Sequence, residues 1–175
     1  MPKKTTIGLI CGGTSGEHEV SLVSAYNIQA ALDREKYKVL IIAIDKNGDW
    51  YLGDDPEFLE DVHDVRQVTF KKNMATALPK VERSFSENLT ATGKYGNELA
   101  EVDVFFPITH GKKGEDGSLQ GLLELLGKPY VGADVYGSAI CMDKDVTKRL
   151  LQHHSIPVSK YKLLRNSDEL SFEDA

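Results

Sequence analysis

The stretch Ile7–Ala25, IGLICGGTSGEHEVSLVSA, places a short apolar run directly before a glycine-rich turn and an amphipathic segment. The apolar run predicts a buried strand over residues 6–11. After the turn, apolar residues recur at spacings of three and four, which predicts one buried helix face. A second apolar run follows at Tyr37–Ile44. The order strand, helix, strand predicts an α/β fold with a parallel sheet and a right-handed crossover. The residues of the predicted helix face are Leu22, Ala25, Ile28 and Leu32.

The rest of the chain divides into an irregular segment and a second ordered part. Asn47-Gly48 predicts a tight hairpin turn between Tyr37–Ile44 and a short run that starts at Trp50. Residues 53–100 are rich in acidic side chains and show no period, so we expect a peripheral insertion there. The elements expected after it are a strand over Val102–Thr109, a helix over Leu119–Leu126 that ends at Gly127, a strand over Pro129–Gly132, a helix from Ser138 to about His153 and a strand over Lys160–Leu164.

The composition excludes several classes of protein. A net charge of −6 over 175 residues disfavours a nucleic-acid surface, which needs clustered lysine and arginine. No apolar stretch approaches the roughly 20 residues of a membrane span, and the run after Lys4 is too short for a secretion signal. Cys11 and Cys141 make no disulfide framework and are expected to be inert packing residues. These features favour a cytoplasmic protein with neither nucleic acid nor membrane as a partner.

The first glycine-rich turn lies where many α/β proteins bind phosphate. Asp45 is a candidate for the acid that ends the second strand of a dinucleotide-binding site. However, G-G-T-S-G does not align with the G-x-G-x-x-G fingerprint. Glu17 and Glu19 would also repel a pyrophosphate. A nicotinamide-dependent oxidoreductase is therefore a disfavoured alternative.

The two glutamates of this turn have two interpretations. Thr14 and Glu17 match the T-x-x-E capping box, in which the glutamate only satisfies a backbone donor. Alternatively, one carboxylate binds a cation, such as a substrate ammonium, at the carboxyl edge of the sheet, where open α/β sheets bind ligands. From the residues alone, a capping role is favoured for Glu17 and for Glu19.

A second glycine-rich loop follows the third predicted strand. His110 stands directly at the end of that strand, and the residues alone favour a structural and a functional role about equally. Glu115 and Asp116 are expected to be first-turn acids and caps of the next helix. Gly121 is unfavourable inside that helix by about 1 kcal/mol, so we expect close packing against the sheet there.

The last predicted helix places Lys144 and Lys148 on one face. Taken alone, this pattern indicates a solvated surface. The sequence contains no histidine and cysteine cluster with metal-ligand spacing and no G-x-S-x-G nucleophile motif.

Three sequence blocks occur in one order: GGTSGEHEVSLVSA (Gly12–Ala25), HGKKGEDGSLQGLLELLGKPYVG (His110–Gly132) and SAICMDKDVTKRLL (Ser138–Leu151). Together they resemble the amino-terminal part of the D-alanine–D-alanine ligases, cytoplasmic ATP-grasp enzymes of bacterial peptidoglycan synthesis. IDKNGDWYL (Ile44–Leu52) is similar to the longer form of that family. The resemblance covers nearly the whole chain apart from residues 53–100.

The resemblance implies a reaction and a role for four residues. ATP phosphorylates one D-alanine, and the amine of a second D-alanine attacks the acyl phosphate. Glu17 matches the glutamate that binds the ammonium of the first D-alanine, and His110 a histidine beside it, which makes these two the candidate catalytic residues. Val20 matches an apolar contact to the methyl group of that substrate, and Lys144 the M-D-K lysine that contacts nucleotide phosphate.

The resemblance also implies a domain organisation. A Rossmann-like pre-ATP-grasp domain is expected over residues 1–137, followed by the incomplete start of an ATP-grasp domain over residues 138–175. The cofactors are ATP and Mg²⁺ or Mn²⁺, whose ligands are expected beyond Ala175. The chain is therefore expected to be a fragment that is inactive alone, from a homodimeric cytoplasmic enzyme. The alternatives are a D-alanine–D-lactate or D-alanine–D-serine ligase and a non-catalytic module for D-amino-acid binding or dimerisation.

Overall fold

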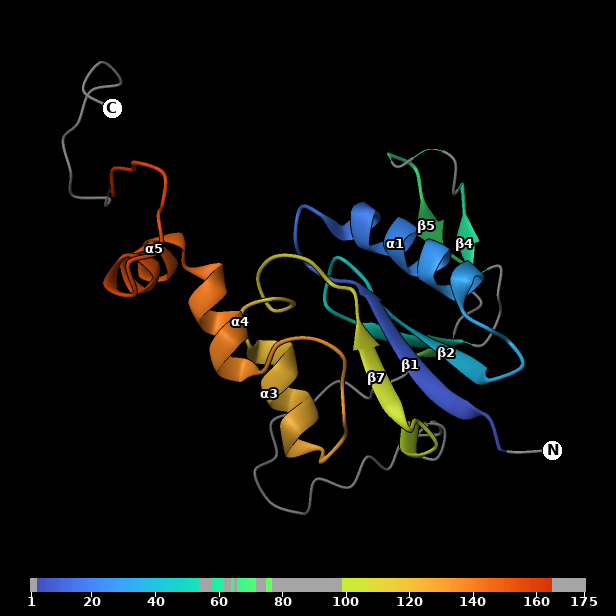
Figure 1. Ribbon diagram of the computed structural model, residues 1–175. Helices are drawn as coiled ribbons and strands as arrows, with labels where there is room; N and C mark the ends of the chain where they lie inside the picture. Colours follow the sequence, from blue (N-terminus) through green and yellow to red (C-terminus); the bar gives the residue numbers. More distant parts are fainter. Residues whose placement is uncertain are drawn as a thin grey trace, which may run out of the picture.

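The computed structural model describes residues 3–53, 58–61, 64, 66–71, 75–76 and 99–164 (Figure 1). The elements in chain order are β1 (Thr5–Gly12), α1 (His18–Ala31), β2 (Tyr37–Ile44), β3 (Trp50–Gly53), β4 (Leu59–Glu60), β5 (Thr69–Phe70), β6 (Ala75–Thr76), β7 (Val104–Pro107), α3 (Ser118–Leu125), α4 (Val135–Met142) and α5 (Lys144–His153).

The main sheet has the strand order β6-β3-β2-β1-β7. β1 pairs in parallel with both β2 and β7, which confirms the predicted parallel arrangement. β2 and β3 are antiparallel, as the Asn47-Gly48 turn predicts. Within the predicted insertion, β4 and β5 form a separate two-stranded sheet, and β6 extends the edge of the main sheet. Most of that insertion lies outside the described residues.

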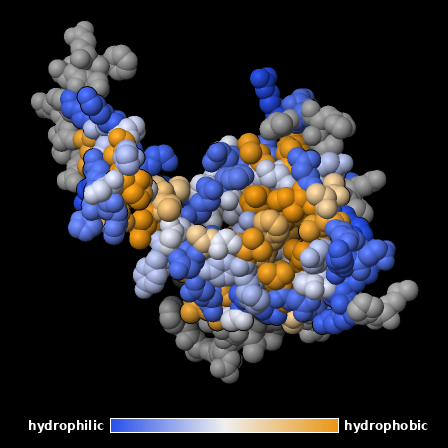
Figure 2. All heavy atoms as spheres, in the orientation of Figure 1, coloured by the Kyte–Doolittle hydropathy of each residue, from blue (hydrophilic) through white to orange (hydrophobic). Residues whose placement is uncertain are grey.

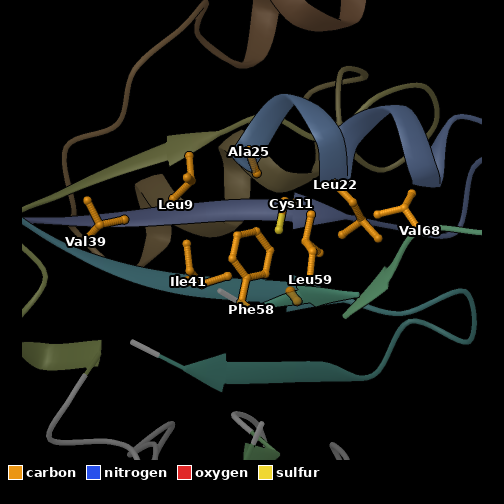
Figure 3. Packing of buried hydrophobic residues seen from close by; sticks show 10 residues of the cluster. Leu9, Cys11, Leu22, Ala25, Val39, Ile41, Phe58, Leu59 and Val68 are labelled. Atoms are coloured by element: carbon orange, nitrogen blue, oxygen red, sulfur yellow. The ribbon is translucent and has the colours of Figure 1, made fainter. Parts of the chain in front are cut away.

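One face of the main sheet is covered by α1 and by the β4–β5 pair (Figure 3). Leu22 and Ala25 of α1 are fully buried against Leu9 and Cys11 of β1 and Ile41 of β2. Complete burial of a leucine stabilises a fold by about 1.5–3 kcal/mol. The predicted apolar helix face is therefore the contact face, and its remaining members, Ile28 and Leu32, are partly buried beside this cluster.

The opposite face of the sheet is covered by α3. Leu119 and Leu123 of this helix pack with Ile10 and Ile42, so the two faces of adjacent strands bury two separate apolar clusters. α3 ends as predicted at Gly127, which has a φ of 64°. The amide of Gly127 donates to the Glu124 carbonyl. The sheet is thus the middle of three layers, and its carboxyl edge carries the loops after β1 and β7.

The single helix predicted from Ser138 to about His153 is two helices. The chain turns at Asp143, whose backbone is extended, with φ −90° and ψ 103°. The Asp143 carboxylate accepts hydrogen bonds from the amides of Asp145 and Val146 at 2.9 and 3.0 Å. An aspartate in this position is a strong helix N-cap, so it starts α5 instead of continuing α4.

Three further local predictions were wrong. Pro129–Gly132 makes one bridge, between Tyr130 and Phe105, instead of a strand. Residues 160–164 form no strand and pair with no described strand. Gly121 does not pack closely on the sheet, since a Cβ there would meet only Val135 Cγ2, at 3.9 Å.

α4 and α5 form an arm that stands apart from the layered body in Figures 1 and 2. α5 contains no buried residue. Apolar side chains remain exposed along the arm, among them Tyr136, Ile140 and Leu150. The arm therefore presents apolar surface that the described residues do not cover.

Candidate functional site

The loops after β1 and β7 are joined by Ser21 of α1. Its hydroxyl accepts a hydrogen bond from the Gly12 amide at 2.8 Å and donates one to the Ile108 carbonyl at 2.5 Å. Ser21 is completely buried, so these bonds are shielded from water. One side chain thus fixes the ends of two parallel strands relative to the start of α1.

Ser21→Ala should lower the free energy of unfolding by about 1–3 kcal/mol, because the buried Gly12 amide and Ile108 carbonyl lose a partner. Urea denaturation measures the loss. Ser24→Ala is the matched control, since Ser24 lies on the same helix and only partly buried. Its change should stay within about 0.5 kcal/mol. Equal losses in both variants would contradict the bridging role of Ser21.

Glu17 lies immediately before α1, and its side chain does not cap that helix. The predicted capping box is absent, because the helix begins at His18. The Glu17 amide donates a hydrogen bond to the Ser15 hydroxyl at 3.2 Å. Glu17 is exposed. Its Oε2 lies beside Gly111 of the second loop, 3.8 Å from the place of a Cβ on that glycine. The carboxylate therefore points to the junction of the two loops, where it can pair with a cation.

Glu19 has a different environment. Its carboxylate forms an ion pair with Lys46, which follows β2, at 2.5 Å. The hydrogen bond from Lys46 holds the pKa of Glu19 below its ordinary value. Glu19 is a first-turn acid of α1, as predicted, and in addition it ties that helix to the β2–β3 turn.

Because the pKa of Glu19 is lowered on folding, its contribution to stability is present above the ordinary pKa of 4.5 and is lost as the pH falls through the lower folded value. The difference in unfolding free energy between the parent and Glu19→Gln should therefore be constant near neutral pH and shrink in acid. Urea denaturation between about pH 3 and 7 measures it. Lys46→Met should give the same profile, and a difference that grows in acid would contradict the ion pair.

His110 lies in the loop after β7 and not directly at the strand end as predicted, because β7 ends at Pro107. A quarter of its side chain is exposed. Its Nδ1 lies 3.7 Å from Glu115 Oε1. Its Nε2 is buried and has no hydrogen-bond partner among the described residues. Buried polar atoms are normally paired, so an unpaired imidazole nitrogen is typical of a position that meets a ligand.

Asp116 supports the start of α3 as predicted, because it accepts a hydrogen bond from the amide of Ser118, the first residue of that helix. Glu115, predicted to be a cap as well, instead bonds within its own loop. Glu115 accepts a hydrogen bond from the Gly111 amide at 2.7 Å, and Asp116 accepts from Lys113 and Ser118. The bond from the Lys113 amide lowers the pKa of Asp116. The N-cap of α3 is Gly117, in the left-handed region, with no side-chain bond to it.

A cavity of about 500 Å³ opens between this loop and the arm, and we call it the Lys144 cavity. His110, Glu115 and Lys144 line it together, so two of the four predicted site residues share one cavity. Lys148, one turn further, instead contacts Ser159 at 3.1 Å and the ring of Tyr161 at 4.6 Å. Lys144 is thus the lysine of this pair that faces the site.

The two cysteines differ. Cys11 is fully buried, as predicted, and burial raises the pKa of its thiol to about 12. Cys141 was predicted to be a packing residue, and this is wrong: it is exposed and lines the Lys144 cavity. The helix in which it lies belongs to the arm, whose outer face lacks a covering layer.

Val20 lies in the first turn of α1 and is 46% exposed. Glu17 and Val20 do not line the Lys144 cavity and instead stand on the α1 side of the loop junction. Sequence reasoning missed Ser21 and His18, whose Nδ1 lies 2.8 Å from the Gly13 carbonyl. The available signal was that both polar residues fall on the apolar face of α1 defined by Leu22 and Ala25.

The comparison with known proteins now decides the family. The model of the D-ala D-ala ligase N-terminus matches residues 6–133. The chain belongs to the D-alanine–D-alanine ligase family. D-alanine–D-alanine ligase A of Escherichia coli strain K12 is 41% identical over 174 residues, which are 98% of this chain and 47% of that ligase. The chain thus spans about half the length of the curated relatives it matches.

Solved ligases of this family have the same fold. The D-alanine–D-alanine ligase of Coxiella burnetii is 39% identical, with a TM-score of 0.69 over 94% of this chain and 45% of that one. VanG D-Ala:D-Ser ligase of Enterococcus faecalis is 31% identical, with a TM-score of 0.64 over 90% of this chain and 44% of that one. The α/β fold expected for the amino-terminal part of an ATP-grasp ligase is therefore confirmed.

Two negative findings apply to the described part of this ligase chain. It holds no group of three or more histidine, cysteine, aspartate or glutamate residues arranged to bind a metal ion. None of its helices has the length and apolar character of a membrane span.

Proposed function

We propose that the chain forms the first-substrate half of an ATP-dependent ligase that joins two D-alanine molecules for peptidoglycan synthesis. The observation that carries the proposal is the exposed, uncapped carboxylate of Glu17 at the junction of the two loops. A carboxylate in this position can hold an ammonium group in a defined orientation. The capping role that the sequence alone favoured is not supported, because Glu17 stands at the N-cap position of α1 and its side chain makes no cap hydrogen bond.

The roles of the four residues follow from their places. Glu17 binds the ammonium of the first D-alanine, and Val20, exposed on the same turn, contacts its methyl group. His110 offers its unpaired Nε2 to the carboxyl end of that substrate. Lys144 places a positive charge in the same cavity as His110, where it offsets the charge of a phosphate.

ATP supplies the phosphoryl group that activates the carboxylate of the first D-alanine. The ammonium group of Lys144 in this cavity suits a phosphate. The described residues lack a metal-binding cluster, so Mg²⁺ or Mn²⁺ is assigned to ligands outside them. The amine of a second D-alanine attacks the carbonyl carbon of the acyl phosphate, the new C–N bond replaces the bond to phosphate, and inorganic phosphate and a proton are released. Orientation of the first substrate makes that attack effectively intramolecular.

The domain organisation belongs to the same proposal. Residues 1–137 form the substrate-binding pre-ATP-grasp domain, and residues 138–175 start the ATP-grasp domain. The exposed Ile140 and Leu150, which follow residue 137, support this division, because such apolar surface suits packing by a further domain. A homodimer and a cytoplasmic location complete the proposal, as they do for the family.

A D-alanine–D-serine ligase is the second candidate. It is favoured by the similarity to VanG D-Ala:D-Ser ligase. Both candidates bind D-alanine at the first site, so the roles of Glu17, Val20 and His110 are common to them.

Titration of the chain with D-alanine, observed by NMR chemical shifts, tests the first-substrate site. We expect D-alanine to shift amides of the residue 13–17 and 110–111 loops, and L-alanine to do so more weakly. Glu17→Gln should abolish the shifts. D-alanine shifts that persist in Glu17→Gln would contradict the proposal, and saturable binding of NADH would favour the oxidoreductase instead. The chain alone is expected to release no phosphate from ATP in response to D-alanine, and such release would contradict this expectation.

A further inference from the structure

A second cavity, of about 390 Å³, lies on the other side of the loop that carries His110. We call it the Trp50 cavity. Its walls are apolar: Ile44 and Leu119 are almost completely buried, and Leu122 is 38% exposed at the mouth. Trp50 from β3 completes these walls. The cavity therefore offers an apolar recess between the β2–β3 turn and α3.

The rim of the Trp50 cavity is cationic. Lys112 and Lys113 line it, and neither ammonium group has a hydrogen bond or ion pair among the described residues. No aspartate or glutamate is among its lining residues. Thr109, a residue only 7% exposed, also lines the cavity, and its buried hydroxyl lacks a partner within the described chain. The nearest acids in sequence, Glu115 and Asp116, are engaged by backbone amides of their own loop.

Lys113 is held in the left-handed region, with φ 67°. Only glycine occupies this region without a steric penalty. The chain thus retains a lysine at the cavity rim in a conformation that glycine would adopt more readily. Such local strain is commonly associated with sites of function.

We propose that the Trp50 cavity binds a small amphipathic organic anion, with its apolar body against Trp50 and Leu122 and its anionic group between Lys112 and Lys113. Charge complementarity selects this class. Free D-alanine is excluded, because its ammonium would find no carboxylate in the lining. A bare phosphate is excluded as well, since it would leave the apolar walls exposed to water.

This site goes beyond the proposed ligase function and is independent of it. The two cavities nevertheless share Thr109, His110 and Gly114. A ligand in the Trp50 cavity therefore contacts the loop that presents His110 to the substrate side.

Trp50 lines this cavity and is the single tryptophan of the chain, so no other tryptophan contributes to its emission. The probe is 1-anilinonaphthalene-8-sulfonate, an aromatic sulfonate, titrated against the 175-residue chain with energy transfer from Trp50 as the signal. We expect saturable one-to-one binding that weakens as the salt concentration rises to about 1 M. Octanoate should displace the probe, whereas octylamine, with the same chain length and the opposite charge, should not.

The double variant Lys112→Met/Lys113→Met should weaken binding of the probe about fivefold or more, through the loss of two positive charges at the rim. The control is Lys36→Met/Lys38→Met, which removes the same charge at the opposite end of the sheet, where both lysines pair with surface acids. Its affinity should stay within about twofold of the parent. Equal affinity in both double variants, or displacement by octylamine, would overturn the proposal.

Lys113→Gly separates the binding role from a structural one. It removes the charge and relaxes the backbone at φ 67°, so the unfolding midpoint should not fall while affinity for the probe decreases about twofold to threefold. Far-UV circular dichroism confirms that each variant is folded. Sedimentation of the parent chain measures its oligomeric state. A dimer that does not bind the probe would mean that a second chain fills the cavity, and this result would also overturn the proposal.

Discussion

Glu17→Gln, made in the complete ligase that carries this chain as its amino-terminal part, should raise the KM for the first D-alanine about 10–100-fold. A charge-assisted hydrogen bond contributes about 1.5–3 kcal/mol, and glutamine keeps the shape of the side chain while it loses the charge. The effect should fall on substrate binding and not on folding, because the Glu17 side chain makes no cap bond to α1. Steady-state kinetics with varied D-alanine give the KM, and urea denaturation gives the stability.

Glu19→Gln is the matched control for this prediction. It stands two residues away, and its carboxylate is already paired with Lys46. We expect a KM within about twofold of the parent and a small loss of stability. If KM and kcat were both unchanged in Glu17→Gln, the carboxylate would be a loop residue without a part in substrate binding.

Gly12→Ala should lower the free energy of unfolding by about 3 kcal/mol or more. Gly12 ends β1 with φ 82°, in the region that favours glycine. A Cβ there would lie 2.2 Å from the carbonyl oxygen of Ile44 on the neighbouring strand. That oxygen belongs to the backbone and accepts the Gly13 amide, so it cannot rotate away. The adjacent strands must therefore separate where the substrate loop begins, and a typical domain is stable by only about 5–15 kcal/mol.

Two neighbouring glycines separate the steric effect from the backbone effect. Gly13 has φ 108°, but a Cβ there would meet nothing within 4 Å, so Gly13→Ala should cost about 1–2 kcal/mol. Gly16 has neither a positive φ nor a near neighbour, and Gly16→Ala should be neutral or slightly stabilising. The order of urea midpoints should be Gly16→Ala, then Gly13→Ala, then Gly12→Ala as the lowest. Similar urea midpoints for Gly13→Ala and Gly12→Ala would contradict the steric argument, because they would show that β1 and β2 accommodate the added Cβ at no extra cost.

Local pattern was sufficient for the body of the fold. The apolar runs of β1 and β2 and the spacing of Leu22 and Ala25 on α1 each depend on burial of one face, which is visible in the order of residues. The local sequence pattern did not predict features that depend on one specific contact. Asp143 divides one predicted helix into two, because its carboxylate caps α5. Residues 160–164 have the composition of a strand but pair with no described strand.

The candidate site shows the same division. The sequence placed His110 and Lys144 on separate elements, and tertiary structure brought both to one cavity. Sequence alone favoured a capping role for Glu17, which is not supported, because its side chain makes no cap hydrogen bond. Val20, Glu17 and their partners at the substrate remain a proposal that the kinetics above will test.

The sequence by itself determined that strands and helices alternate, that the sheet is parallel at its centre and that glycine-rich loops follow β1 and β7. These features depend on periodicity and on residues close in the chain. Only the tertiary structure decided that Ser21 joins the two loops, that Glu19 is neutralised by Lys46 while Glu17 is not, and that Lys112 and Lys113 border an apolar cavity. Each of these depends on a contact between elements that are distant in the sequence. The role of a charged side chain here therefore depends on its tertiary neighbours, which the local sequence does not reveal.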